Sequence, residues 1–144
     1  MIPSKSPVTA ADINKLLESQ DMDACLGYLT LVNGIDGALL CGQDGWVLAH
    51  GENTLEGMRI ETPYFLYQFT ETLARVETLG LEPLESQIAF GGQKFYMILN
   101  IARSNRFFLV VSGARGSYDL FKYRVERVAQ ALADLLRDRG YFRS

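Results

Sequence analysis

The sequence has few of the residues on which most catalytic and metal centres depend. It contains one histidine, two cysteines and one tryptophan in 144 residues. Because His50 is the only imidazole, a Ser–His–Asp or Cys–His arrangement could be completed only around it. The tripeptide HGE that begins at His50 matches half of the zinc-deaminase signature, but the P-C-x-x-C half is absent. We therefore interpret His50 as an ordinary residue at a strand end, and expect no catalytic residue, metal or cofactor.

Positive charge is also scarce. Lysine and arginine number 14 against 17 aspartates and glutamates, which gives a net charge of −3. Proteins that bind nucleic acids usually carry a basic excess, because much of their affinity comes from neutralising phosphates. We therefore expect no nucleic-acid partner. Cys25 and Cys41 are predicted to be small core hydrophobes in a reducing compartment, because a chain of this length needs no disulfide framework.

Long apolar runs are missing as well. No stretch approaches the ~18 residues needed to cross a bilayer. The first residues, MIPSKSPVTAAD, lack the apolar region of a secretory signal. These absences predict a cytoplasmic protein with no membrane insertion. A composition of 48% hydrophobic and 22% charged residues is typical of a globular domain. We expect residues 1–8 to form a flexible leader and residues 9–144 a single domain, with an extra helical segment over residues 9–20.

Glycine is concentrated in NGIDGALLCGQDGWVLAHG, residues 33–51, which suggests either a phosphate loop or a hairpin. Phosphate loops place their glycines directly between a strand and a helix N-terminus. Here the glycines lie between a predicted helix and a strand, and between two strands. Asp44-Gly45 is a strong hairpin signal, because tight hairpin turns need positive φ. We therefore predict a hairpin, with Gly34 as the left-handed cap of the preceding helix.

Apolar periodicity along the chain predicts an α+β fold of order α-β-β-α-β-β-β-α. The apolar pattern slips at residues 19–21, so the first predicted helix either kinks there or ends, with a second helix capped by Asp21. The later predicted helices begin at Thr62-Pro63 and at Ser117, and they end before Gly80 and Gly140. The predicted later strands are residues 85–90, 94–102 and 106–112. The strand at 94–102 is apolar on both alternating sets of positions, so helices should cover both faces of a five-stranded antiparallel sheet. The short and polar strand at 85–90 suits a sheet edge.

The second predicted helix carries a surface signal. At 100° per residue its core-facing arc contains Phe65, Leu66, Phe69, Leu73 and Val76. The opposite arc contains Tyr64, Tyr67, Glu71, Ala74, Arg75 and Thr78. Tyrosine and arginine on a face that should be solvated are typical of binding surfaces. We predict a dimer or partner interface that includes Tyr64, Tyr67, Glu71 and Arg75.

The segment SGARGS, residues 112–117, lies between a predicted strand and a helix N-terminus. Backbone amides in such a turn can hold an anion, with an arginine alongside. The segment lacks the lysine of a nucleotide site, and a plain tight turn is the favoured interpretation. The candidate anion-binding residues are Gly113, Arg115 and Ser117.

The helix that leads into residues 33–51, and the later GGQKFYMILNIARSNRFFLVVSGARGS before a final amphipathic helix, resemble the Roadblock/dynein light chain family. The similarity spans roughly residues 21–138. It implies a Roadblock/profilin-like sheet with two helices on one face and one on the other. Family members are typically non-enzymatic and form dimers in which the third strands and second helices of two copies meet. The resemblance thus implies a dimer edge at Glu85, Gln87, Ile88 and Phe90.

Family members also bind and regulate Ras-like small GTPases, or serve as adaptors in motor and signalling complexes. The resemblance therefore implies a homodimeric regulatory or scaffold module for such a GTPase. The alternative is a small-molecule sensor of the PAS or GAF kind, which also packs an antiparallel sheet against helices. A sensor needs an interior pocket with a few polar groups. The strands are instead well filled with apolar residues, and Asn100 is the clearest polar break in them.

Overall fold

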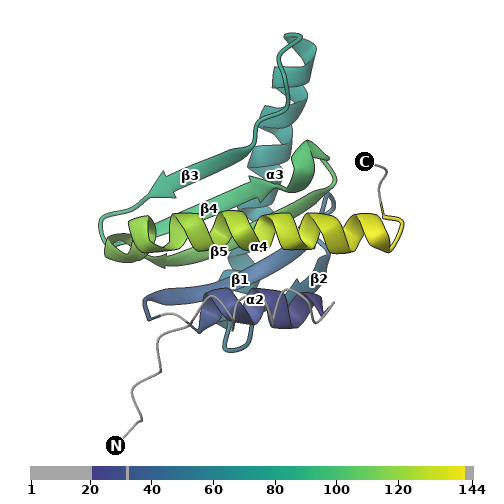
Figure 1. Ribbon diagram of the computed structural model, residues 1–144. Coiled ribbons are helices and arrows are strands. Elements are labelled where there is room, and N and C mark those ends of the chain that lie inside the picture. Colours follow the sequence, from purple (N-terminus) through teal and green to yellow (C-terminus); the bar gives the residue numbers. More distant parts are fainter. Residues whose placement is uncertain (1–20, 32, 142–144) are drawn as a thin grey trace, which may run out of the picture.

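The computed structural model describes residues 21–31 and 33–141, so the predicted leader and the helical segment at 9–20 lie outside the described residues. The described elements follow the predicted order (Figure 1). They are α2 (Met22–Thr30), β1 (Ile35–Gly42), β2 (Val47–His50), α3 (Glu56–Thr78), β3 (Ser86–Phe90), β4 (Lys94–Asn100), β5 (Phe107–Ala114) and α4 (Tyr118–Asp138). Two short 3-10 turns, Ile101–Arg103 and Arg115–Ser117, follow β4 and β5.

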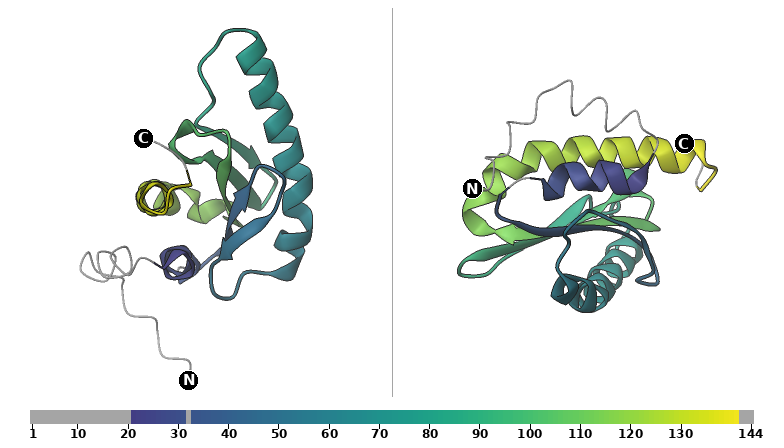
Figure 2. Two further views of the ribbon diagram at one scale, coloured as in Figure 1. Left: turned by 90° about the vertical axis from the view of Figure 1, so that its right-hand side faces the viewer. Right: turned by 90° about the horizontal axis from the view of Figure 1, so that it is seen from below.

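The five strands form one antiparallel sheet in the order β2-β1-β5-β4-β3. Helices α2 and α4 lie side by side on one face, and α3 covers the other face (Figures 1 and 2). Helix α3 runs across the strands, and its C-terminal end projects past β3. The predicted fold class is confirmed: an α+β sheet sandwiched between helices, with the 85–90 segment at a sheet edge.

Burial divides the core into two layers, one on each face of the sheet. Phe95 and Met97 of β4 join the layer beneath α2 and α4, whereas Ile98 and Tyr96 join the layer beneath α3. The residues of α4 that face the sheet are spaced three and four apart and are all buried; they are Phe121, Val125, Val128, Leu132 and Leu135. Both cysteines are fully buried, as predicted. Among the described helices, none is both long and apolar enough to cross a membrane.

Two helix ends and one turn have the structure that the local sequence predicts. The Asp21 carboxylate accepts a hydrogen bond from the Asp23 N–H at 2.9 Å and so caps α2. The Asp44-Gly45 turn joins β1 to β2, and Gly45 has a φ of 86°. Helix α3 ends two residues before Gly80, where the last backbone carbonyls are satisfied by the N–H groups that follow the helix.

The role predicted for Gly34 is wrong. Its φ of 93° is left-handed, but α2 already ends at Thr30, so Gly34 is not the cap of that helix. It lies in the turn that enters β1, where its carbonyl accepts a hydrogen bond from the Ala114 N–H at 2.6 Å. A side chain here would collide with the hydroxyl of Ser117 at the start of α4. Glycine is therefore needed for a close approach between two segments distant in sequence.

The predicted start of the second helix is also wrong. Helix α3 begins at Glu56, so Pro63 lies inside the helix and Thr62 does not cap it. The Thr62 side chain is buried and donates a hydrogen bond to the Met58 carbonyl at 2.6 Å. Proline inside a helix removes one backbone hydrogen bond. Burial of Met58 and Thr62 against the sheet outweighs this local cost, and the helix continues through the proline.

The predicted strand at 94–102 ends early, at Asn100. Ala102 and Arg103 have φ values of 51° and 53°, in the left-handed region that strands exclude. The Asn100 side chain supports this turn, because its amide nitrogen donates to the Leu84 carbonyl and to the Asn105 side chain. Asn100, the buried polar residue at the end of β4, thus stabilises the β4–β5 connection through its side-chain hydrogen bonds.

Candidate functional site

The outer face of α3 exposes a row of apolar and aromatic side chains. Tyr64 is 73% exposed and Tyr67 is 64% exposed, while Leu66 on the opposite side of the helix is buried. The exposure predicted for the two tyrosines is confirmed, and Glu71 and Arg75 are exposed as well. The Glu71 carboxylate raises the pKa of Tyr67 through a hydrogen bond, because that bond favours the protonated phenol.

Ile60 belongs to the same row but was missed in the sequence. It lies one turn before Tyr64 and is 63% exposed. The spacing of Ile60, Tyr64 and Tyr67, four and then three residues, places all three side chains on one helix face. The helix predicted from the sequence begins at Thr62-Pro63, so Ile60 lies outside it and could not be placed on this face. We refer to Ile60, Tyr64 and Tyr67 together as the α3 outer row.

The β3 edge of the sheet is open within the part of the chain that the structure describes. The Asn100 N–H donates to the Glu85 carbonyl at 2.8 Å, and the Gly91 N–H donates to the Lys94 carbonyl at 2.7 Å. Residues 85 and 91 therefore direct their backbone groups toward β4. Because backbone direction alternates along an antiparallel strand, the backbone N–H and C=O groups of Ser86, Ile88 and Phe90 point away from the sheet.

The opposite edge, β2, is protected. It has four residues, and a bulge interrupts its pairing with β1 between Leu40 and Cys41. The Gly51 N–H points toward β1, where it donates to Ala38, so the preceding N–H of His50 points outward. That N–H donates to the Asp23 carboxylate of α2 at 3.1 Å. Short length, a bulge and a capped N–H are means by which edge strands avoid pairing with other chains.

The side chains predicted for the dimer edge differ in their surroundings. Glu85 is exposed and forms an ion pair with Arg103, and Gln87 is exposed. Ile88 is half-buried and packs against the core beneath α4. The Phe90 ring is 47% exposed and meets the Tyr118 ring of α4 edge-on, with the centroids 5.1 Å apart.

The three candidate anion-binding residues lie in different surroundings. Gly113 is buried within β5, where it pairs with Ile35 and Phe95. Ser117 is half-buried against Gly34. The Arg115 guanidinium is exposed, donates to the Gly91 carbonyl at 3.2 Å and lies 4.9 Å from the centroid of the Phe90 ring. Anion binding at this turn stays a prediction. Arg115 is the exposed positive charge that would hold the anion.

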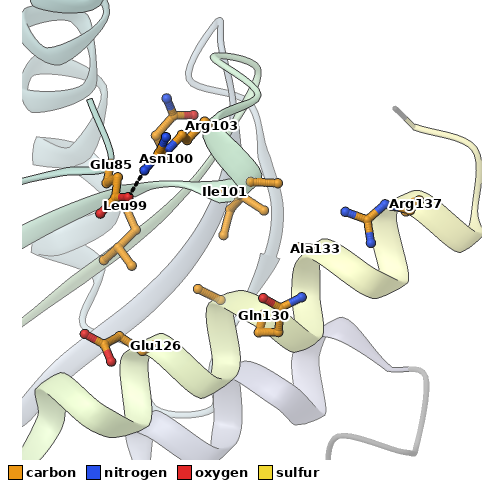
Figure 3. Close-up of a pocket in the computed structure, with 11 residues that line it drawn as sticks. Glu85, Leu99, Asn100, Ile101, Arg103, Glu126, Gln130, Ala133 and Arg137 are labelled. Atoms are coloured by element: carbon orange, nitrogen blue, oxygen red, sulfur yellow. Dashed lines mark hydrogen bonds and ion pairs between the residues drawn. The ribbon is translucent and has the colours of Figure 1, made fainter. Parts of the chain in front are cut away.

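A depression lies between α4 and the β4–β5 connection (Figure 3). It has a volume of about 340 Å³ and opens to solvent. Leu99, Ala129 and Ala133 are among its apolar lining residues, and charged side chains, among them Glu85, Glu126 and Arg137, surround it. Asn100 borders the depression, but its amide nitrogen already bonds Leu84 and Asn105. The polar break that a sensor would use for ligand recognition thus supports the β4–β5 connection.

Titratable groups in the described part of the chain form no metal-binding cluster. No three histidine, cysteine, aspartate or glutamate side chains among the described residues lie close enough to hold a metal ion. Burial raises the pKa of the Cys25 thiol to about 11 and that of the Cys41 thiol to about 12, so both are protonated at neutral pH. His50 is exposed at the end of β2, as predicted.

The sheet order and the helices on both faces are similar to those of solved MglB and Roadblock/LC7 structures. MglB from Myxococcus xanthus matches the structure with a TM-score of 0.70 at 14% identity, over 81% of this chain and 95% of that one. The gliding protein MglB from Thermus thermophilus matches with a TM-score of 0.68 at 18% identity, over 90% of this chain and 94% of that one. A Roadblock/LC7 domain from Streptomyces avermitilis also has a TM-score of 0.68, at 13% identity, over 81% of this chain and 98% of that one.

Profilin IA from Acanthamoeba castellanii matches with a TM-score of 0.50 at 14% identity, over 83% of this chain and 99% of that one. The fold is therefore Roadblock/profilin-like, and the resemblance predicted from the sequence is confirmed at the level of structure. No protein-family model and no curated protein matches the sequence.

Proposed function

We propose that this chain is a non-enzymatic, cytoplasmic module that forms a homodimer through β3 and regulates or scaffolds a Ras-like small GTPase. The observation that carries the dimer is the difference between the two sheet edges. The β2 edge is short, bulged and capped by Asp23, whereas the β3 backbone groups at Ser86, Ile88 and Phe90 have no partner strand among residues 21–31 and 33–141. An exposed edge of this kind is a template for pairing with a second strand.

Pairing of two β3 strands defines a two-fold arrangement. The outward backbone groups are those of Ser86, Ile88 and Phe90, so an antiparallel pair centred on this segment places Ile88 opposite Ile88 of the second copy. Helix α3 projects past β3, so its C-terminal end would lie over the second copy (Figure 2). Leu79 and Leu81 are large, exposed side chains at that end, and contact with the second copy would bury them. A specific dimer of this size should bury roughly 1,200–2,000 Å².

The proposed GTPase surface is the α3 outer row. It points away from the sheet and so stays accessible when two β3 strands pair. Large aromatic side chains in a cluster supply contact area at low entropic cost. The Roadblock resemblance supports a Ras-like GTPase as the partner, and the structural matches to MglB and Roadblock/LC7 domains are consistent with that class. No residue here is assigned as an arginine finger, so stimulation of hydrolysis would come from reshaping the GTPase.

Light scattering and two proline variants test the dimer. We expect the unmodified chain to run as a dimer at micromolar concentration. The variant Ser86→Pro removes an N–H that points outward and should yield a folded monomer. The neighbouring variant Gln87→Pro removes an N–H that points toward β4, so it should lower the melting temperature instead. A monomeric unmodified chain, or a dimer unaffected by Ser86→Pro, would contradict pairing through β3.

Binding to purified Ras-like small GTPases tests the partner. A panel of these proteins is loaded with GTP or with GDP, and the affinity for the dimer and the rate of GTP hydrolysis are measured. We expect at least one member to bind with a preference for one nucleotide state. Absence of binding across the panel would overturn the GTPase assignment and leave the dimer in place.

A further inference from the structure

The Phe90 side chain is exposed at the open edge of β3, and the depression between α4 and the β4–β5 connection lies near that edge. The geometry of strand pairing relates the Phe90 side chain of one copy to the depression of the other. This inference rests on the proposed β3–β3 dimer. With Ile88 opposite Ile88 of the second copy, Ser86 lies opposite Phe90 of that copy. Paired residues of this type have Cα atoms about 5.5 Å apart. The relation holds twice, once in each direction across the two-fold axis.

The side chains concerned all lie on the α4 side of the sheet. Ile88 packs against the core beneath α4, and the Phe90 ring contacts Tyr118 of α4. Since side chains alternate along a strand, Ser86 shares this side with Ile88 and Phe90. Leu99 pairs with Ser86 across β3 and β4 and packs against the same core. Leu99, Ser86 and the second copy's Phe90 therefore form one row across the interface.

Small side chains leave a hollow beside this row. Leu99 lines the 340 Å³ depression of Figure 3, and α4 contributes Ala129 and Ala133 to its lining. Ser86, the exposed residue that pairs with Leu99 at the edge of the sheet, has a short side chain. The Phe90 ring of the second copy, 47% exposed in one chain, has the size and position to enter from that edge.

The charged side chain beside Phe90 is positive, and carboxylates border the depression, so the two surfaces proposed to meet are complementary in charge. The Arg115 guanidinium lies over the Phe90 ring, so it accompanies that ring into the second copy's depression. Two carboxylates border the depression, from Glu85 and Glu126. Glu85 is already held by Arg103, whereas Glu126 is exposed and forms no ion pair within the described residues. Glu126 is therefore the carboxylate that can receive Arg115 from the second copy.

We propose that each chain inserts Phe90 into the α4 depression of a second copy, with Arg115 of one chain paired to Glu126 of the other. The ring supplies apolar contact with Leu99 and Ala129, and the ion pair selects the register in which Ser86 faces Phe90. The candidate anion-binding arginine thus has a specific anion, which is a carboxylate of the second copy. The site is incomplete in one chain and occurs twice in the dimer.

Two charge-reversal variants test this arrangement. In Arg115→Glu homodimers, two glutamates face each other at both contacts, and in Glu126→Arg homodimers two arginines do so. We expect each variant to raise the dissociation constant of the dimer about tenfold or more, because like charges at an interface repel. Mixing the two variants restores an opposite-charge pair at both contacts. Native mass spectrometry of the mixture should then show heterodimers in excess over both homodimers, with near-normal affinity.

The controls separate the ion pair from general charge effects. Glu52→Arg and Arg59→Glu reverse exposed charges away from β3, and their mixture should form dimers in statistical proportions. Phe90→Ala removes the ring and should weaken the dimer roughly 100-fold, as for a central aromatic at an interface. Circular dichroism verifies that every variant is folded.

The outcomes distinguish this inference from the proposed function on which it rests. A monomeric unmodified chain would overturn the β3 dimer and, with it, the insertion of Phe90. A dimer that tolerates Phe90→Ala and both charge reversals, and whose variants mix statistically, would overturn the insertion alone. Preferential heterodimers formed by the Arg115→Glu and Glu126→Arg chains would support it.

Discussion

The phenol oxygen of Tyr96 in β4 lies 2.6 Å from the hydroxyl oxygen of Thr62 in α3. Thr62 donates its own proton to the Met58 carbonyl, so the Tyr96 O–H is the donor between the two side chains. The Phe65 ring stacks on the Tyr96 ring, with the centroids 4.2 Å apart. This contact fixes α3 relative to β4 near the open edge of the sheet. It thereby sets the direction of the α3 outer row on the other side of the helix.

We predict that Thr62→Val lowers the free energy of unfolding by about 1–3 kcal/mol, because the largely buried Tyr96 hydroxyl loses its partner. The double variant Thr62→Val with Tyr96→Phe removes both polar groups and should recover much of that loss. Urea denaturation of the single and double variants measures the coupling. The matched control is Thr72→Val, which removes an exposed hydroxyl from the same helix and should change the free energy by less than about 0.5 kcal/mol. Additive effects of the two core substitutions would contradict the Thr62–Tyr96 bond.

The buried thiols predict a loss of stability at alkaline pH. Burial raises the pKa of Cys25 to about 11 and that of Cys41 to about 12, from an ordinary value of 9.0. Above pH 9 the unfolded chain therefore binds fewer protons than the folded chain, and the free energy of unfolding falls as pH rises. This contribution is fully present below pH 9 and is lost as pH rises through 11 to 12. Urea denaturation between pH 7 and pH 10.5 measures the slope.

A substitution and a chemical probe check the origin of that slope. Cys41→Ala removes one of the two raised thiols, so the free energy of unfolding should fall less steeply above pH 9. Ellman's reagent should react with the folded protein at pH 8 far more slowly than with the protein in urea, since only the thiolate is reactive. Rapid reaction of both thiols in the folded state would show that they are accessible and ionised.

The α3 outer row makes a separate prediction about binding. Tyr64→Ala combined with Tyr67→Ala should leave the melting temperature nearly unchanged, because both side chains are exposed. The same double variant should weaken GTPase binding by ~2 kcal/mol or more if the tyrosines are central to the interface. Calorimetric titration beside a thermal melt measures both quantities. Ile60→Ala, one turn earlier, should weaken binding in the same direction.

A buried neighbour provides the contrast. Leu66→Ala should cost roughly 2–5 kcal/mol of stability, because it leaves a cavity beneath α3. Unchanged partner affinity in the tyrosine variant would show that these residues are ordinary surface residues. A large fall in its melting temperature would show that they belong to the core.

The isolated protein should hydrolyse neither GTP nor ATP. The sequence has no phosphate-binding loop with its lysine, and the glycine-rich stretch at 33–51 forms a hairpin. Phosphate release is measured across the fractions of a final gel-filtration step. Activity that coincides with the protein peak in every fraction and survives further purification would contradict the prediction.

Much of the fold could be read from short-range patterns. The two-sided apolar alternation of β4 requires cover on both faces of the sheet, and Asp44-Gly45 requires a tight turn between β1 and β2. Asp21 and Gly80 mark the ends of helices through capping chemistry that involves only neighbouring residues. The polar sequence of β3 likewise indicates a sheet edge. Each of these signals acts over a few residues, so the sequence alone contains the physical information.

The start of α3 and the identity of the available edge depended on contacts distant in sequence. Thr62-Pro63 has the local pattern of a helix start, but burial of Met58 and Thr62 against the sheet extends the helix back to Glu56 and adds Ile60 to the outer row. The β2 edge is closed by Asp23, which lies 27 residues from the His50 N–H that it caps. The hollow beside Leu99 exists because α4 places two alanines over the sheet. Local propensity contributes a few tenths of a kcal/mol to ~1 kcal/mol per residue, and tertiary burial of a side chain contributes more. The sequence by itself therefore determined the order of elements and their turns, and the tertiary structure decided which surfaces remain open for a partner.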